Sequence, residues 1–453
     1  MQYTQRMPVR GQDLPANWRA GLRGDSPQLR DCLGPLGPFG PFLPLGPFHC
    51  HVSWSALFWP HSHRLKTWLT VLFFCLTGAT LPAADPLPSQ AELARRVVVL
   101  ANSDDPDSLR IARHYAAARG VPRENIIALP LPSDETIGWD VFVAGLWDPL
   151  LERLVAARWV DAIPMELHDY AGRRKYAVHS HRIAALVVCR GVPLRITHEP
   201  RLYGEALPFT RRTEFRTNAG AVDAELALLP MPGYPINAFV PNPLYQDERP
   251  AAEDRRRVVL VSRLDGPTAE DAMALVDGAV RAEKRGLRGR AYIDLSERDP
   301  LGNEWLEKAG AYAQELGYET IVDRGPEIFP LTTPLRRTAI YLGWYAQDLG
   351  GALAAPDFRF EPGAIALHIH SYSATTLRSP TAHWTGPLVA RGAAATVGNV
   401  WEPYLHYTHR PHLLMKKLAA GATWAEAGYY ALQGLSWQGV LIGDPLYRPF
   451  PKK

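Results

Sequence analysis

The stretch RRVVVLANSDDPDSLRIARHYAAARG, residues 95–120, predicts a strand followed directly by a helix. Residues 95–102 carry a β-branched apolar run, which is typical of a parallel strand that is buried on both faces. Asp105 can cap a helix whose first turn contains Pro106, because both residue types favour helix starts. Gly120 can end that helix. This unit indicates an α/β protein.

The same alternation of strands and helices continues along the chain. Further helices are predicted at 268–286, 305–316 and 423–435. Strands are predicted at 125–132, 181–196, 256–266, 288–296, 318–323, 336–346, 363–369 and 392–400. This order predicts a mostly parallel sheet with helices on both faces. Residues 197–255 break the rhythm and predict a long surface insertion that flanks the site.

Composition limits the classes of partner. The chain has 453 residues, of which 47% are hydrophobic and 21% charged, as in a globular protein. Its net charge of +3 comes from the N-terminal extension, because the first 66 residues hold seven Lys/Arg and three Asp/Glu. The remainder is nearly neutral. No nucleic-acid partner is therefore expected.

The first residues are expected to lie outside the folded domain. Residues 1–64 include LGPLGPFGPFLPLGPF and predict a Pro/Gly-rich disordered extension, or translation from upstream of the true start. Residues 65–84 follow the order of a secretory signal peptide. We therefore expect a secreted or periplasmic protein, with a domain at 90–453 and no transmembrane anchor once the signal is removed.

The stretch GAIALHIHSYSA, residues 363–374, predicts a buried strand that ends in reactive side chains. Such groups suggest chemistry at the carboxyl end of a strand. His370 and Ser371 are neighbours, and neighbours on a strand point to opposite faces. A base from elsewhere would therefore suit Ser371 or Ser373 better, with Glu402 orienting that base. The candidate bases are His383, His406 and His409; the alternative is an ordinary strand end.

A metal site is a second alternative. His368 and His370 would share one face of the strand. Glu402 and His406 would share one side of a helix, with His409 one turn further on. These residues match no established metal-binding motif, and we predict no metal or other cofactor.

Motif order resembles that of the gingipain-type cysteine peptidases, whose fold is related to the caspases. The matching stretches are LVVCRGVP, LVSRLDGPTAED with Arg263, GAAATVGNV and IGDPLYRP. The resemblance implies a caspase/gingipain-like sheet. Where that family carries its catalytic His, this chain has Gly343-Trp344-Tyr345, and Ser371 stands near the place of the catalytic Cys. Because Trp has no titratable nitrogen and a Ser hydroxyl is a weak nucleophile, the resemblance implies that cysteine peptidase activity has been lost.

The chain resembles more closely an uncharacterised secreted family of bacteria that carry exosortase-type protein sorting systems. The matching stretches are NSDDPDSLRIARHYAAARGVP, SRLDGPT, GAAATVGNVWEPYL and LSWQGVLIGDPLYRP. This family has no established activity, so the resemblance implies secretion and not a reaction.

A cleft is predicted at the carboxyl ends of the strands near 341–345 and 368–373. Its rings could form a platform for a sugar or a peptide, although ordinary packing of large rings is the alternative. Arg263 and Asp265 could line this cleft, but a structural ion pair is favoured. We expect binding of a peptide or polysaccharide, or else hydrolysis by Ser371 with a His/Glu partner or a metal. The predicted lining comprises Arg263, Asp265, Gly343, Trp344, Tyr345, Tyr372, His383 and Trp384.

Overall fold

A computed structural model describes residues 88–203, 212–231 and 233–451. Residues Asp85–Lys453 belong to one compact unit. The predicted extension at 1–64 and the predicted signal at 65–84 lie outside the described residues. In the described ranges, none of the helices combines the length and the apolar character that crossing a bilayer requires.

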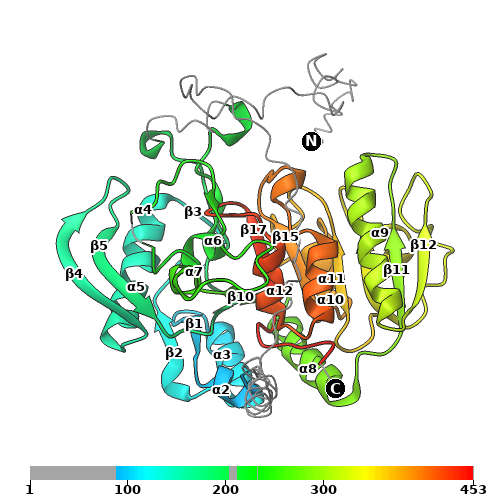
Figure 1. Ribbon diagram of the computed structural model, residues 1–453, viewed down its shortest axis with the longest axis horizontal. Coiled ribbons are helices and arrows are strands. Elements are labelled where there is room, and N and C mark those ends of the chain that lie inside the picture. The colour runs from blue at the N-terminus through cyan, green and yellow to red at the C-terminus, as the bar shows by residue number, and fades with distance from the viewer. Residues whose placement is uncertain (1–87, 204–211, 232, 452–453) are drawn as a thin grey trace, which may run out of the picture. The chain divides into compact units, whose positions relative to one another are not determined.

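A ten-stranded sheet forms the centre of the fold (Figure 1). Its strands, in spatial order, are β12 (Glu319–Asp323), β11 (Arg290–Asp294), β13 (Thr338–Gly343), β14 (Ile365–His368), β15 (Ala395–Asn399), β17 (Gly439–Gly443), β10 (Val261–Leu264), β6 (Ala185–Cys189), β1 (Val97–Asn102) and β2 (Ile126–Leu129).

Most neighbouring strands in this sheet are parallel. This holds from β12 to β15 and again from β10 to β2. β17 is antiparallel to β15, and its pairing with β10 is confined to Arg263 and Ile442. The predicted α/β fold with a mostly parallel sheet is confirmed.

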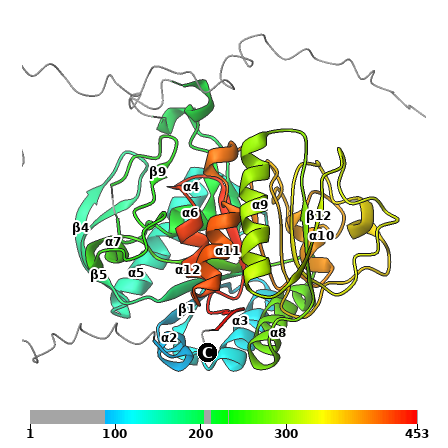
Figure 2. The same cartoon turned by 45° about the vertical axis from the view of Figure 1, so that its right-hand side comes forward.

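Helices cover both faces of the sheet. On β1, Val97 and Val99 pack with α3, while Val98 and Leu100 belong to the cluster that contains α5. Helices α9, α11 and α12 lie side by side over the other half of the sheet (Figures 1 and 2). The helices are α2 (Gln90–Ala94), α3 (Pro106–Arg119), α4 (Trp139–Phe142), α5 (Asp148–Ala156), α6 (Val222–Leu226), α7 (Ala252–Arg257), α8 (Ala269–Arg285), α9 (Pro300–Glu315), α10 (Thr385–Ala390), α11 (Pro411–Ala419) and α12 (Trp424–Ala431).

The opening strand and helix form as their sequence dictates. The carboxylate of Asp105 accepts bonds from the N–H groups of Asp107 and Ser108, which would otherwise lack a partner in the first turn. Gly120 ends the helix at a φ of 69°, a conformation that favours glycine. All six residues of β1 are buried, as the unbroken apolar run predicts.

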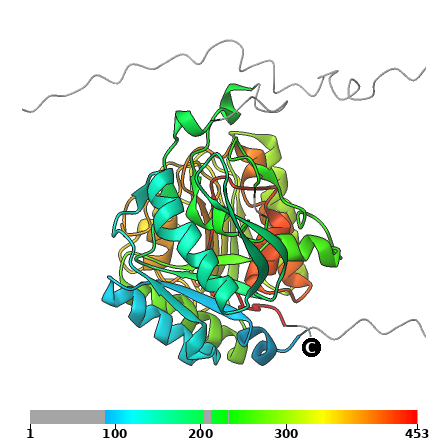
Figure 3. The same cartoon turned by 90° about the vertical axis from the view of Figure 1, so that its left-hand side faces the viewer.

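Two parts of the chain differ from the sequence-based expectation. The first is a two-stranded ribbon that was not predicted, formed by β4 (Val160–His168) and β5 (Arg174–His181). It lies at one end of the molecule, seen from that side in Figure 3. The predicted surface insertion is wrong in part, because residues 221–230 are buried. The smaller strands are β3 (Thr136–Ile137), β7 (Arg195–Ile196), β8 (Gly220–Ala221), β9 (Val240–Pro241) and β16 (Gly434–Leu435).

Segments that follow several strands meet over the carboxyl ends of β14 and β15. Trp401, just after β15, donates its indole N–H to the Ile196 carbonyl at 3.2 Å, and the Arg195 guanidinium carbon lies 4.3 Å from the Trp401 ring centroid. Glu135, which follows β2, accepts a 2.6 Å bond from the Thr376 hydroxyl. These contacts bring distant parts of the chain together where α/β proteins usually bind ligands.

Candidate functional site

Ser371 and Glu402 form the central polar pair of the site. Ser371 follows β14 and Glu402 follows β15, so the pairing of these strands brings the two side chains together. The Ser371 hydroxyl donates to Glu402 Oε1 at 2.6 Å, and the Tyr404 N–H donates to the same oxygen at 3.2 Å. A hydroxyl bound to a carboxylate makes a short, charge-assisted bond. The serine hydroxyl therefore has a fixed direction and a carboxylate acceptor.

His370 does not activate Ser371. Its Nδ1 donates to the backbone carbonyl of Ser371, and its ring lies 4.6 Å from the Tyr345 ring, centroid to centroid. Burial lowers the pKa of His370, which favours the neutral ring. With Nδ1 protonated, Nε2 of the neutral ring is a hydrogen-bond acceptor.

The other predicted catalytic partners also lie elsewhere. Ser373 is buried, and its hydroxyl accepts a 3.0 Å bond from the Asn399 N–H, which is a structural role. His383 Nδ1 lies 3.8 Å from Asp348. His406 is exposed, with its ring 6.5 Å from that of Trp305.

His409 cannot serve as the base or as a ligand beside Glu402. It is buried, and desolvation lowers its pKa to about 3. The helix expected to align Glu402 with His406 does not form, because Tyr404 has a φ of 63° and only Leu405–Tyr407 is helical. The described residues contain no cluster of three or more His, Cys, Asp or Glu side chains suited to a metal ion.

A buried chain of polar groups lies beneath the site. The Tyr341 hydroxyl donates to Asp294 at 3.0 Å and lies 3.1 Å from His368 Nδ1. His368 Nε2 accepts a 3.0 Å bond from the Ala346 N–H, so the proton of the neutral ring is on Nδ1 and points to Tyr341. Burial lowers the pKa of His368 well below its usual value. Burial also disfavours the charged form of Asp294, which raises the pKa of its carboxyl group to about 7.

This buried chain holds the loop after β13 in place. Ala346 donates its N–H to His368, and its carbonyl accepts a 2.7 Å bond from the indole of Trp384. The Trp384 and His368 rings stack with centroids 3.4 Å apart. Both backbone groups of Ala346 are therefore fixed, which positions the preceding Tyr345 at the surface.

Five residues expected to line the cleft are instead buried. Trp344 turns into the core, where its indole N–H donates to Asn303 at 2.8 Å. Trp384, which stacks on His368, is fully buried. A side chain on Gly343 would meet the Tyr341 hydroxyl. Arg263 and Asp265 are buried beside Asp223, and charges that are buried in this way need to be paired. The five are Arg263, Asp265, Gly343, Trp344 and Trp384.

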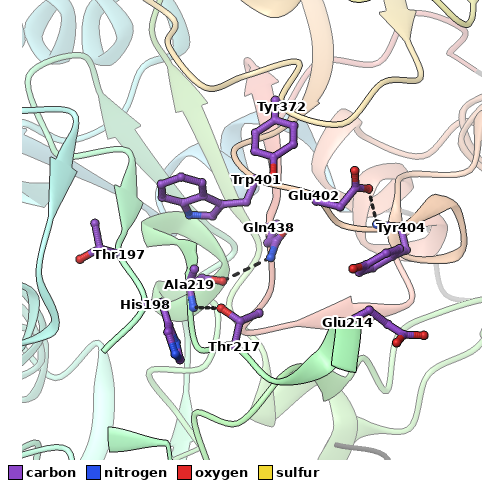
Figure 4. Close-up of a pocket in the computed structure, with 10 residues that line it drawn as sticks. All are labelled: Thr197, His198, Glu214, Thr217, Ala219, Tyr372, Trp401, Glu402, Tyr404 and Gln438. Atoms are coloured by element: carbon purple, nitrogen blue, oxygen red, sulfur yellow. Dashed lines mark hydrogen bonds between the residues drawn. The ribbon is translucent and has the colours of Figure 1, made fainter. Parts of the chain in front are cut away.

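Tyr345 and Tyr372 remain exposed, and Tyr372 borders a pocket of about 320 Å³ (Figure 4). Side chains from the segments after β14 and β15 form one side, and residues around β7 and β8 form the other. The polar groups include Glu402, Glu214 and Gln438. The pocket is lined by Thr197, His198, Glu214, Thr217, Ala219, Tyr372, Trp401, Glu402, Tyr404 and Gln438.

Most of these lining residues were missed in the sequence. Trp401 and Tyr404 flank Glu402 in WEPY, so the aromatic residues around that carboxylate were an available signal. Thr217 and Ala219 could not be found this way, because the pairing of β7 with β8 brings them to the pocket.

Neither a protein-family model nor a curated protein matches the chain. A solved structure described as "Structure of Protease" is 10% identical, with a TM-score of 0.40 over 80% of this chain and 79% of that chain. A similarity at that level carries no inference here. The fold class rests on the strand order, and the gingipain-type and exosortase-associated resemblances stay predictions.

Proposed function

We propose that the chain binds a polysaccharide in the pocket beside Glu402. The observation that carries this proposal is the lining itself, in which three aromatic side chains accompany two carboxylates and an amide. Aromatic faces pack on the apolar faces of sugar rings, while planar polar groups can pair with hydroxyls. A pocket of about 320 Å³ is large enough for a small ligand segment.

A peptide fits this place less well. Peptides that bind to sheets usually add a strand to a free edge. β14 pairs with β13 and with β15, so it offers no free edge next to the pocket. Peptide binding therefore becomes an outcome of the test and not the proposal.

We further propose that the protein is exported and lacks cysteine peptidase chemistry. The predicted signal at 65–84 supports export. Cys189 is the one cysteine in the described residues, and it is fully buried in β6. Burial raises the pKa of its thiol, so the nucleophilic thiolate is disfavoured. A polysaccharide of the cell envelope or its surroundings would then be the ligand.

Hydrolysis by Ser371 is the second candidate function, and the 2.6 Å bond to Glu402 favours it. In such a reaction Glu402 would accept the hydroxyl proton while Ser371 Oγ added to an acyl carbon. The bond from that carbon to its alcohol or amine would then break, the proton would pass to this leaving group, and water would hydrolyse the acyl-serine. His370 does not take this role in the observed arrangement, because the Ser371 hydroxyl donates to Glu402 and not to His370 Nε2.

Labelling with a fluorophosphonate probe separates the two candidates. We expect the purified protein to show no stoichiometric adduct by intact mass, because Ser371 has a carboxylate partner but no imidazole base. Ser379, a half-buried serine in the segment between β14 and α10, provides the control position. An adduct that disappears in Ser371→Ala but persists in Ser379→Ala would establish the hydrolase and contradict a purely binding role.

Replacing Tyr372 with Ala tests the pocket. The ring is 43% exposed and makes no hydrogen bond through its hydroxyl among the described residues, so its removal should leave folding intact. We expect affinity for the best-binding member of a panel of soluble glucan, mannan, xylan, chitin oligomers and polygalacturonate to fall about tenfold. Titration followed by tryptophan fluorescence measures this change.

Leu331→Ala is the control, because Leu331 is also an exposed apolar residue but lies outside the pocket. Its affinity should match that of the unaltered protein. Equal losses in both variants, or binding of an unstructured peptide in preference to every polysaccharide, would contradict the proposal.

A further inference from the structure

A row of side chains continues from the pocket along the carboxyl ends of the strands. Glu402 accepts from Ser371, and the adjacent His370 lies against Tyr345. The guanidinium carbon of Arg298, which follows β11, lies 4.4 Å from the Tyr345 ring centroid. Four strand ends, those of β15, β14, β13 and β11, thus contribute consecutive members of this row.

Arg298 is exposed and forms no ion pair among the described residues. The neighbouring carboxylates have other partners. Asp299 caps α9 by accepting from the Leu301 N–H at 2.8 Å, and Asp348 accepts from the His383 N–H at 2.6 Å. The guanidinium therefore keeps free donors, which match a carboxylate or phosphate in geometry and charge.

Buried residues below Arg298 help to fix the position of its side chain. The aromatic contact orients its guanidinium, and the bonds from Ala346 to His368 and Trp384 hold Tyr345. A fixed arginine loses little conformational freedom when it binds an anion, and such preorganisation favours affinity. The buried network thus supports a surface cation that has no partner within the described chain.

We infer that Arg298, with Tyr345 and His370, forms a second subsite that binds a carboxylate of an acidic polysaccharide whose neighbouring residues occupy the pocket at Glu402. This inference rests on the proposed polysaccharide binding. Arg298 pairs with the carboxylate, and Nε2 of neutral His370 accepts a ligand hydroxyl. Glu402 and Glu214, at the far end of the row, disfavour a second carboxylate inside the pocket.

Hyaluronan oligosaccharides, in which each carboxylate-bearing sugar is followed by a neutral one, and their methyl esters test this subsite, because the two forms differ in the carboxylates alone. We expect the acid form to bind the full chain about tenfold more tightly, as a charge-assisted bond allows. Arg298→Gln should abolish that preference without changing affinity for the ester. Arg288→Gln is the matched control, since Arg288 is exposed just before the opposite end of β11 and should keep the preference.

Equal affinity for the two forms, or a preference that survives Arg298→Gln, overturns the subsite while leaving the pocket proposal standing. Absence of binding to both forms and to every member of the polysaccharide panel overturns both proposals. Loss of ester binding in Arg298→Gln also contradicts the inference, because the neutral ligand does not need the guanidinium.

Discussion

Replacing Arg263 with Met is expected to lower the free energy of unfolding by about 3–5 kcal/mol. The guanidinium is fully buried and donates to Asp223 at 2.5 and 3.1 Å, to Asp265 at 3.3 Å, and to the carbonyls of Val192 and Pro193. Met fills similar volume but leaves two carboxylates and two carbonyls without donors. Burying an unpaired charge is far more unfavourable than losing an exposed pair.

Urea unfolding of the variant and of Arg290→Met measures this effect. Arg290 pairs with Glu319 at 2.8 Å on the sheet surface, where solvent weakens the interaction. The control should lose no more than about 1 kcal/mol. Similar losses in the two variants would show that the buried Arg263 cluster does not hold α6 and the loop after β6 against β10.

Asp294 is expected to make stability fall as the pH rises. Its carboxyl has an ordinary pKa of 3.8 when exposed and about 7 when folded, because burial disfavours the charge. Between these values the folded chain retains a proton that the unfolded chain has released. Its contribution is therefore fully present below the unfolded pKa and is lost as pH rises through about 7.

Asp294→Asn should remove this dependence. Relative to the unaltered protein, the variant should gain about 3 kcal/mol in unfolding free energy between about pH 5 and pH 8. Buried histidines such as His368 and His409, whose lowered pKa values give the opposite trend, are present in both proteins and cancel in the difference. Urea unfolding across this range checks it, and a difference independent of pH would contradict a protonated Asp294.

Local patterns were sufficient for much of the fold. The strand at Val97–Asn102 and the helix at Pro106–Arg119 follow from residues adjacent in sequence: an apolar run, a capping Asp and a terminal Gly. The buried segment at 221–230 was not found, because its burial depends on packing against β10 and β17 from distant parts of the chain. The direction of β17 could not be read from its own residues either.

In the candidate site, too, some features follow from local sequence while others depend on the surrounding structure. The position of Ser371 at a strand end was predictable, but the alternation argument for His368 and His370 assumed a strand through both, and β14 ends at His368. One ring is therefore buried, while the other lies half-exposed against Tyr345. The sequence predicts Glu402 as an orienting group for a histidine, whereas in the structure its partner is Ser371. Side-chain direction after the end of a strand depends on the loop, which periodicity does not describe.

We propose that ligand recognition takes place between the strand ends, with the aromatic rings and not a catalytic dyad as the main contact. Tyr372 and Trp401 come from neighbouring loops that hydrogen-bond to each other, the Tyr372 N–H donating to the Trp401 carbonyl at 2.9 Å. Their relative position is thus fixed before a ligand arrives. Such preorganisation reduces the conformational entropy lost on binding.

A crystal structure of the protein with the tightest-binding oligosaccharide of the panel tests the central claim most directly. We expect a sugar residue in the pocket, in contact with Tyr372 and Trp401 and within hydrogen-bond distance of Glu402 (Figure 4). An oligosaccharide bound elsewhere with this pocket empty, for example along the exposed Ile163 and Leu167 of the β4–β5 ribbon, would contradict it.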